Sequence, residues 1–364
     1  MKKVLFMVIF LLMASNGWCA DKYVRAAGGN FNTAATWATT SGGTEETTVP
    51  GGADNVFVDS NSGNLVMDSM SDVEGFNMTG YTGTMSGTGD MTIYSSTGAN
   101  VLLFAGTVTW NGGITIRANS GSSITVTMDG HQITGSNYFN VNTSSWNTGA
   151  IYLEDNFGCT ATTSNGEYGS LYLDGASDDN GNSHTWYAIR LSAVQYLGDS
   201  TQTITRSSTS YGYRSSTASV TTGTSLITFT GADSYFSGTG GTFGDVTFNN
   251  TSGSIVIPTS ATYDTLTIGR NKTATFTDGT TQTVSSFVAT GTSGNEIVLT
   301  GSSTAGWDLS DSTGTNAVEY CTIDYSTAGG GATWNALTTA GNTDGGNNSG
   351  WTFTSATGAP PQIW

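Results

Sequence analysis

Apolar residues recur along this chain about every 20 positions, each within a short stretch in which apolar and polar residues alternate. The recurring positions are Val56, Phe76, Ile93, Ile114, Ile133, Ile151, Leu171, Leu191, Leu226, Val246, Leu266 and Phe287. Alternation is typical of β-strands, and this period is typical of a solenoid whose coils bury their apolar faces against one another. The ladder predicts an all-β fold, a single-stranded parallel β-helix of about 20 residues per coil with N- and C-terminal caps.

Composition favours strands and turns over disorder. The chain has 364 residues, of which 50 are Gly and only 10% are charged. Gly allows turns with positive φ, and Thr and the β-branched aliphatics favour strands. Low complexity would also fit a disordered chain, but 36% of the residues are apolar and they recur at strand spacing. We therefore expect a folded chain.

The N-terminus has the pattern of a secretory signal peptide. Two lysines precede an apolar run from Val4 to Ala14, and small residues up to Ala20 follow. Such a run is too short to span a bilayer comfortably, and no second long apolar segment follows it. We expect a secreted, extracellular or cell-surface protein with no membrane span after signal removal.

Charge argues against one class of partner. The formal net charge is −17, and removal of Lys2 and Lys3 leaves 8 basic against 27 acidic side chains, a balance of −19. Such a charge repels nucleic acid and anionic membranes. We therefore expect no nucleic-acid partner.

Four segments are expected along the chain. They are a signal peptide at 1–20, an N-terminal cap at 21–52, the parallel β-helix at 53–325, and a C-terminal capping coil and tail at 326–364. Cys159 and Cys321 would then lie about eight coils apart, roughly 40 Å at strand spacing, which is too far for a disulfide bond. Both are predicted to be buried or free thiols.

The chain resembles secreted right-handed parallel β-helix surface proteins of bacteria and their phages, such as adhesins and tail-fibre segments. The resemblance lies in the Gly/Ser/Thr/Asn-rich coils, in an opening with Trp37 and Pro50 to Val56, and in a closing segment from Asp344 to Trp351. It implies a right-handed coil and a surface role. It is architectural, so it transfers no functional residue.

Two coils place acidic side chains in equivalent positions. The segments Ile151-Tyr152-Leu153-Glu154 and Leu171-Tyr172-Leu173-Asp174 match position for position, 20 residues apart. Carboxylates stacked in this way favour either a raised pKa or a bound cation. The candidate ligands of a weak Ca²⁺ site are Glu154, Asp174, Asp178 and Asn180. The alternatives are solvated acids that bind nothing and a catalytic carboxylate pair. No other cofactor is expected.

Aromatic and arginine residues gather in an irregular stretch between positions 184 and 214. Aromatic faces stack on sugar rings, and guanidinium groups bind hydroxyls and carboxylates. The candidate glycan contacts are Tyr152, Tyr172, Trp186, Tyr187, Arg190, Tyr196, Arg206, Tyr211, Tyr213 and Arg214. The alternative is a widened coil packed by its own aromatic side chains.

The favoured function is non-enzymatic: a secreted structural or adhesive protein whose rigid surface binds glycans weakly. Its expected partner is a cell-surface or environmental polysaccharide, and self-association is a further expectation. The motifs of polygalacturonases and pectate lyases are absent or in the wrong order. The alternatives are a hydrolase or lyase with an unrecognised acid pair and, from the Thr-x-Thr pairs, ice binding.

Overall fold

The structure is a computed structural model. It describes residues 20–69, 71–95, 100–118, 124–129, 131–133, 139–141, 150–153, 157–159, 166–168, 170–172, 183–186, 189–191, 195–196, 199–205, 207–209, 212–215, 220–221, 223–249 and 252–354. All but the last residue of the expected signal peptide therefore lies outside the described part of the chain.

The fold is all-β and its parallel sheets stack as a β-solenoid of about 21 residues per turn, which confirms the predicted fold class. The described helices are two short 3₁₀ turns, Ala34–Thr36 and Thr338–Ala340. Across the described residues, no helix is long and apolar enough to cross a membrane. The chain divides into two compact units, one of residues 1–131 with 142–149 and one of residues 132–141 with 150–364.

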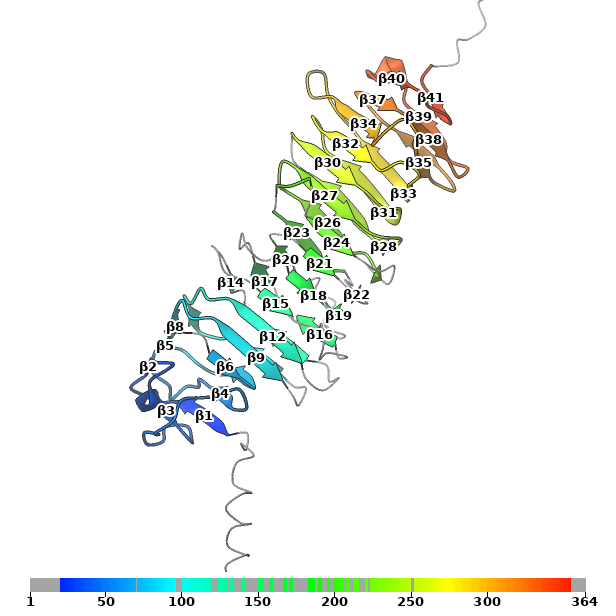
Figure 1. The fold of residues 1–364 in the computed structure, drawn as a ribbon. Helices are drawn as coiled ribbons and strands as arrows, with labels where there is room; N and C mark the ends of the chain where they lie inside the picture. The colour runs from blue at the N-terminus through cyan, green and yellow to red at the C-terminus, as the bar shows by residue number, and fades with distance from the viewer. Residues whose placement is uncertain are drawn as a thin grey trace, which may run out of the picture. The chain divides into compact units, whose positions relative to one another are not determined.

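In the first unit, successive coils contribute strands to three parallel sets (Figure 1). The first set holds β1 (Asp21–Val24), β4 (Asn55–Phe57), β7 (Gly75–Asn77), β10 (Asn100–Leu103) and β13 (Ile124–Thr127). The second holds β2 (Gly29–Asn30), β5 (Leu65–Met67), β8 (Thr84–Gly87) and β11 (Thr107–Val108). The third holds β6 (Ser71–Val73), β9 (Met91–Ser95) and β12 (Ile114–Ala118). Strand β3 (Trp37–Ala38) pairs antiparallel with β1 and so covers its free edge.

The second unit, taken by itself, has the same kind of parallel pairing. One set holds β16 (Ala150–Leu153), β19 (Ser170–Tyr172), β22 (Gln195–Tyr196) and β25 (Val220–Thr221). An 11-stranded sheet includes β17 (Phe157–Cys159), β20 (Ser183–Trp186), β23 (Thr201–Ile204), β26 (Leu226–Phe229), β29 (Asp245–Phe248), β31 (Ala261–Ile268), β33 (Thr281–Ala289), β35 (Trp307–Ser310) and β38 (Ser326–Gly329). A 9-stranded sheet includes β18 (Gly166–Tyr168), β21 (Ile189–Leu191), β24 (Tyr213–Ser215), β27 (Ser234–Ser237), β30 (Ser254–Ile257), β32 (Thr273–Phe276), β34 (Ile297–Gly301), β37 (Cys321–Asp324) and β40 (Thr343–Gly346).

The apolar ladder is correct in part. Val56 pairs with Phe76 in the next coil, as expected, and both are fully buried. The next partner of Phe76 is Leu102, whereas Ile93 lies in another sheet and pairs with Ile116. With three strands per coil, a step of about 20 residues sometimes arrives at a different face of the same coil.

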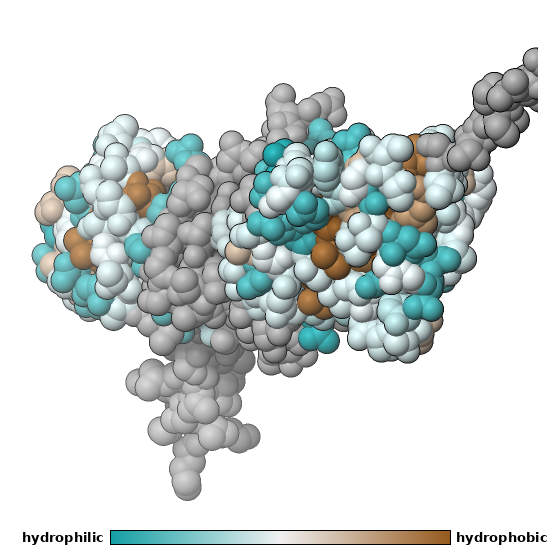
Figure 2. Space-filling model, turned by 90° about the horizontal axis from the view of Figure 1, so that it is seen from above, coloured by the Kyte–Doolittle hydropathy of each residue, from teal (hydrophilic) through white to brown (hydrophobic). Residues whose placement is uncertain are grey.

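In the second unit the ladder is again correct only in part, because Leu171 pairs with Gln195 instead of Leu191, and Leu226 pairs with Asp245 while Ile227 pairs with Val246. Other steps are confirmed. Ile151 pairs with Leu171, and Val246 pairs with Leu266, which in turn pairs with Phe287. The last three side chains are buried, and their neighbours along each strand face outward. Figure 2 shows a surface that is mostly hydrophilic or neutral in its coloured part, with only scattered hydrophobic residues.

Aromatic rings stack between coils in the interior. Phe229 stacks on Phe248 with ring centroids 4.7 Å apart, and Phe276 stacks on Trp307 at 3.8 Å. Phe229 and Phe248 are register partners, and parallel pairing at about 4.8 Å brings such positions to the distance at which aromatic rings attract each other. Phe276 and Trp307 belong to different sheets and stack across the interior. These stacks add to the apolar area that each coil buries against the next.

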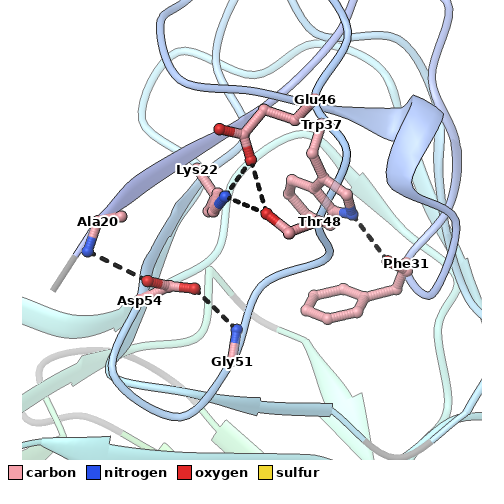
Figure 3. A network of polar contacts seen from close by, with 8 residues as sticks. All are labelled: Ala20, Lys22, Phe31, Trp37, Glu46, Thr48, Gly51 and Asp54. Carbon is pink, nitrogen blue, oxygen red and sulfur yellow. Dashed lines mark hydrogen bonds and ion pairs between the residues drawn. The ribbon is translucent and has the colours of Figure 1, made fainter. Parts of the chain in front are cut away.

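Polar contacts close the N-terminal end of the first unit (Figure 3). The buried Lys22 ammonium pairs with Glu46 and donates to Thr48 Oγ1 at 3.0 Å. The Trp37 indole N–H donates to the carbonyl oxygen of Phe31 at 2.7 Å. These bonds satisfy buried side-chain polar groups at this end of the unit.

Lys272 connects three successive coils of the second unit. Lys272 is only 2% exposed, and its Nζ donates to the carbonyl oxygens of Ala232 at 2.9 Å and Ser252 at 2.7 Å. The three residues are spaced 20 apart, so they occupy equivalent corners. Burial lowers the pKa of Lys272 to about 8, an effect partly opposed by the Asp233 carboxylate.

The Lys272 pKa predicts a pH-dependent contribution to stability. Between pH 8 and about 10, this lysine is protonated in the unfolded chain and deprotonated in the folded chain. The free energy of unfolding therefore rises with pH in this range because of Lys272. Denaturant unfolding of the wild type and of Lys272→Met across this range measures the effect. The wild type should gain stability relative to the variant as pH rises. A constant difference between the two proteins contradicts the assignment.

Candidate functional site

Three tyrosines occupy one register row of the second unit. Tyr152 in β16 pairs with Tyr172 in β19, which pairs with Tyr196 in β22. The expected alignment of Tyr152 with Tyr172 is therefore present in the backbone register, and the pairing adds Tyr196 to the row. Equivalent positions in neighbouring strands share one face of the sheet, about 4.8 Å apart.

Two arginines occupy another row. Arg190 in β21 pairs with Arg214 in β24, and Glu167 in β18 pairs with Arg190 from the other side. Arg214 is exposed, whereas its neighbours Tyr213 and Ser215 are fully buried. Alternation along β24 therefore directs the arginine outward and the two neighbouring side chains inward.

The prediction that Tyr213 contacts a glycan is wrong. Its side chain is 0% exposed, and its ring stacks on Phe236 at 5.0 Å and meets the edge of Phe243 at 5.7 Å. Burial also raises the pKa of its hydroxyl. Tyr213 is therefore a core residue and does not contact a ligand on the surface.

Trp186 lies in a row whose later members are buried. It pairs with Ile204, which pairs with Phe229, and both of these side chains are 0% exposed. Its register position thus belongs to the interior row of β23 and β26, which favours the alternative in which aromatic residues of this stretch pack the coil.

The other predicted site residues lie outside the described part of the chain. These are the glycan-contact candidates Tyr187, Arg206 and Tyr211 and the Ca²⁺ candidates Glu154, Asp174, Asp178 and Asn180. In the part that is described, no group of three or more His, Cys, Asp or Glu side chains is placed to bind a metal ion.

A row of threonines escapes sequence reasoning. Thr185, Thr203, Thr228, Thr247 and Thr267 pair in succession from β20 to β31. The last four are partly exposed. Their spacings of 18, 25, 19 and 20 residues hide the row from a search at fixed period. Only the recurring triplet of apolar residue, Thr and apolar residue, as in Val246-Thr247-Phe248, could have indicated it.

Sequence reasoning also misses a partly exposed aromatic pair in the first unit. Tyr23 in β1 pairs with Phe57 in β4, and their partly exposed rings stack at 4.9 Å. The pKa of Tyr23 is raised by burial and by the carboxylates of Asp21 and Asp59. In the sequence, these two positions are marked only by the alternation of apolar and polar residues.

Cys321 is a free, buried cysteine, as predicted. Its Sγ lies 3.4 Å from the carbonyl oxygens of Ala289 and Glu319, to which the thiol donates. Burial raises the pKa of this thiol to about 12, so it stays protonated at neutral pH and is a poor nucleophile.

No family model, curated protein or solved structure matches this chain. Its class is therefore given by the fold alone, a parallel β-solenoid.

Replacement of Tyr213 tests its place in the core. Tyr213→Ala removes a buried aromatic ring and should lower the free energy of unfolding by about 3–5 kcal/mol. Tyr235→Ala, at a partly exposed position in the next strand, serves as the control and should cost less than about 1 kcal/mol. Denaturant unfolding measures both. Equal and small losses would show that Tyr213 is not packed in the interior.

Proposed function

We propose that this chain is a secreted, non-enzymatic structural or adhesive solenoid that binds polysaccharide through an aromatic row. The observation that carries the proposal is the register of Tyr152, Tyr172 and Tyr196 in three successive coils. A row of tyrosines on one face offers repeated stacking surfaces to successive sugars of an extended polymer.

The solenoid favours such binding for two physical reasons. Parallel pairing holds each coil in place, so the row is organised before the ligand arrives and little conformational entropy is lost on binding. The net charge of −17 keeps the surface soluble and disfavours nucleic acid as a competing polymer. Secretion is part of the proposal, because the N-terminus has the pattern of a signal peptide.

Glycan-array binding of the full-length protein, followed by an assay for release of reducing sugar, tests this function. The wild type should retain at least one polysaccharide and release no sugar. The triple variant Tyr152→Ala/Tyr172→Ala/Tyr196→Ala should lose at least about tenfold in affinity, since each aromatic contact contributes about 0.5–1.5 kcal/mol. Tyr235→Ala should bind like the wild type.

Three results contradict the proposal or part of it. Sugar release by the wild type would indicate a polysaccharide-active enzyme, and absence of binding to any glycan would leave a purely structural role. Equal binding by the triple variant and the wild type would remove the tyrosine row from the site.

A second candidate function, ice binding, is favoured by the threonine row. β-Branched side chains are stiff at χ1, so Thr203, Thr228, Thr247 and Thr267 can repeat one arrangement of hydroxyl and methyl groups from coil to coil. A regular array of this kind can order the water layer at an ice surface. The neighbouring outward row includes Leu226 and Asp245, which interrupts the array.

Thermal hysteresis of the purified protein tests ice binding. The wild type should lower the freezing point below the melting point, and Thr247→Tyr should abolish the difference because a bulky ring breaks the row. Thr322→Tyr, at a partly exposed position of β37, is the matched control and should keep it. Absence of hysteresis in the wild type excludes this function.

A further inference from the structure

Arg190 and Arg214 stand directly opposite each other in neighbouring parallel strands. Like charges at opposite positions destabilise a sheet, because their separation of about 4.8 Å leaves the repulsion poorly compensated. Local arrangements that oppose stability are typical of functional sites. A pair of this kind therefore calls for an anion that offsets its charge.

The pairing is notable in a chain with so few cations. The sequence holds 10 Lys and Arg residues against 27 Asp and Glu residues. Three other described cations have structural partners: Lys22 pairs with Glu46, Arg25 pairs with Glu45, and Lys272 donates to two carbonyl oxygens. Arg270 is exposed in a turn without such a partner among the described residues, but no second arginine is its register neighbour in a strand. Among the side chains that the structure describes, Arg214 has no ion-pair partner and is exposed.

The remaining register positions of the row hold one acidic residue and one serine. Glu167 pairs with Arg190 from one side, and the buried Ser237 pairs with Arg214 from the other. The row thus carries one negative and two positive charges, with the excess positive charge at its Arg214 end. Guanidinium groups bind carboxylates and sulfates through paired, charge-assisted hydrogen bonds.

The arginine and tyrosine rows come from consecutive strands of the same coils. Arg190 in β21 precedes Tyr196 in β22 by six residues, and Glu167 in β18 precedes Tyr172 in β19 by five. The two rows belong to different sheets, so a polymer that engages both crosses from one sheet to the next within a coil.

We propose that the Arg190–Arg214 pair binds the anionic group of an acidic polysaccharide, the carboxylate of a uronic acid or a sulfate ester. The inference rests on the proposed function, because it names the class of glycan that the tyrosine row would hold. It adds a selection rule that holds at an ionic strength of about 0.15 M, where a Debye length of about 8 Å screens the net negative charge of the chain from a polyanion. Under that condition, glycans with an acidic group at the matching sugar bind more tightly than their neutral counterparts.

The test compares three ligands at one fixed salt concentration: a polyuronate, a sulfated galactan and a neutral glucan. The full-length wild type should bind at least one acidic ligand about tenfold or more tightly than the glucan. Arg190→Gln/Arg214→Gln should lose that preference and keep its affinity for the glucan. Arg190→Lys/Arg214→Lys keeps the charge without the guanidinium geometry and should restore only part of it.

A matched control and a folding control accompany these variants. Arg270→Gln removes an exposed arginine from a turn and should leave every affinity unchanged. Thermal unfolding without ligand should show that the Gln double variant is at least as stable as the wild type, because the like-charge repulsion is gone.

The outcomes separate the two proposals. Stronger binding of the polyuronate identifies the group as a carboxylate, and stronger binding of the galactan identifies it as sulfate. If the wild type binds the glucan as well as the acidic ligands, the acidic selection is wrong while glycan binding stands. If it binds none of the ligands here or on the glycan array, both proposals fail. Equal losses for acidic and neutral ligands in the Gln variant also overturn the inference.

Discussion

The structure depends on main-chain hydrogen bonds between successive coils. A strand inside a sheet is paired on both sides, as β29 is between β26 and β31, so it has no free edge. The coils must approach closely to make these bonds. At Gly253, where φ is +100°, a Cβ atom would lie 2.1 Å from the carbonyl oxygen of Ala232, so only glycine permits the approach. Pairing, corners and ends are consequences of this one constraint.

Parallel pairing in register also turns a local residue choice into a surface. A side chain repeated once per coil becomes a row with a spacing of about 4.8 Å, whether it is Thr, Tyr or Arg. A ligand that repeats along one direction suits such a surface better than a compact ligand does. The proposals for polysaccharide and for ice rest on this common geometry.

The sequence predicts the fold class well and individual rows less well. Val246, Leu266 and Phe287 follow a constant step, so their pairing was foreseeable. The step from Phe76 to Leu102 is 26 residues, because turn lengths vary, and no fixed period finds it.

The candidate site divides in a similar way. Two matching sequence segments predict the alignment of Tyr152 with Tyr172. The sequence pattern also predicts that Tyr213 lies on the surface, whereas its side chain is buried. An aromatic residue fits either face of a strand, so composition alone cannot choose between a core and a binding surface. Whether Tyr213 faces inward depends on which residues of β24 point to the core, and the register with the neighbouring coils decides that.

Disulfide trapping tests the in-register stacking most directly. In a protein with Cys159 and Cys321 replaced by alanine, Tyr152→Cys and Tyr172→Cys should form a bond under mild oxidation, since a Cα separation of about 4.8 Å lies within the usual disulfide range. Tyr152→Cys with Tyr196→Cys, two coils apart, should not. If Tyr152→Cys instead links to Leu171→Cys, or only to Tyr196→Cys, the register is different and the rows built on it do not exist.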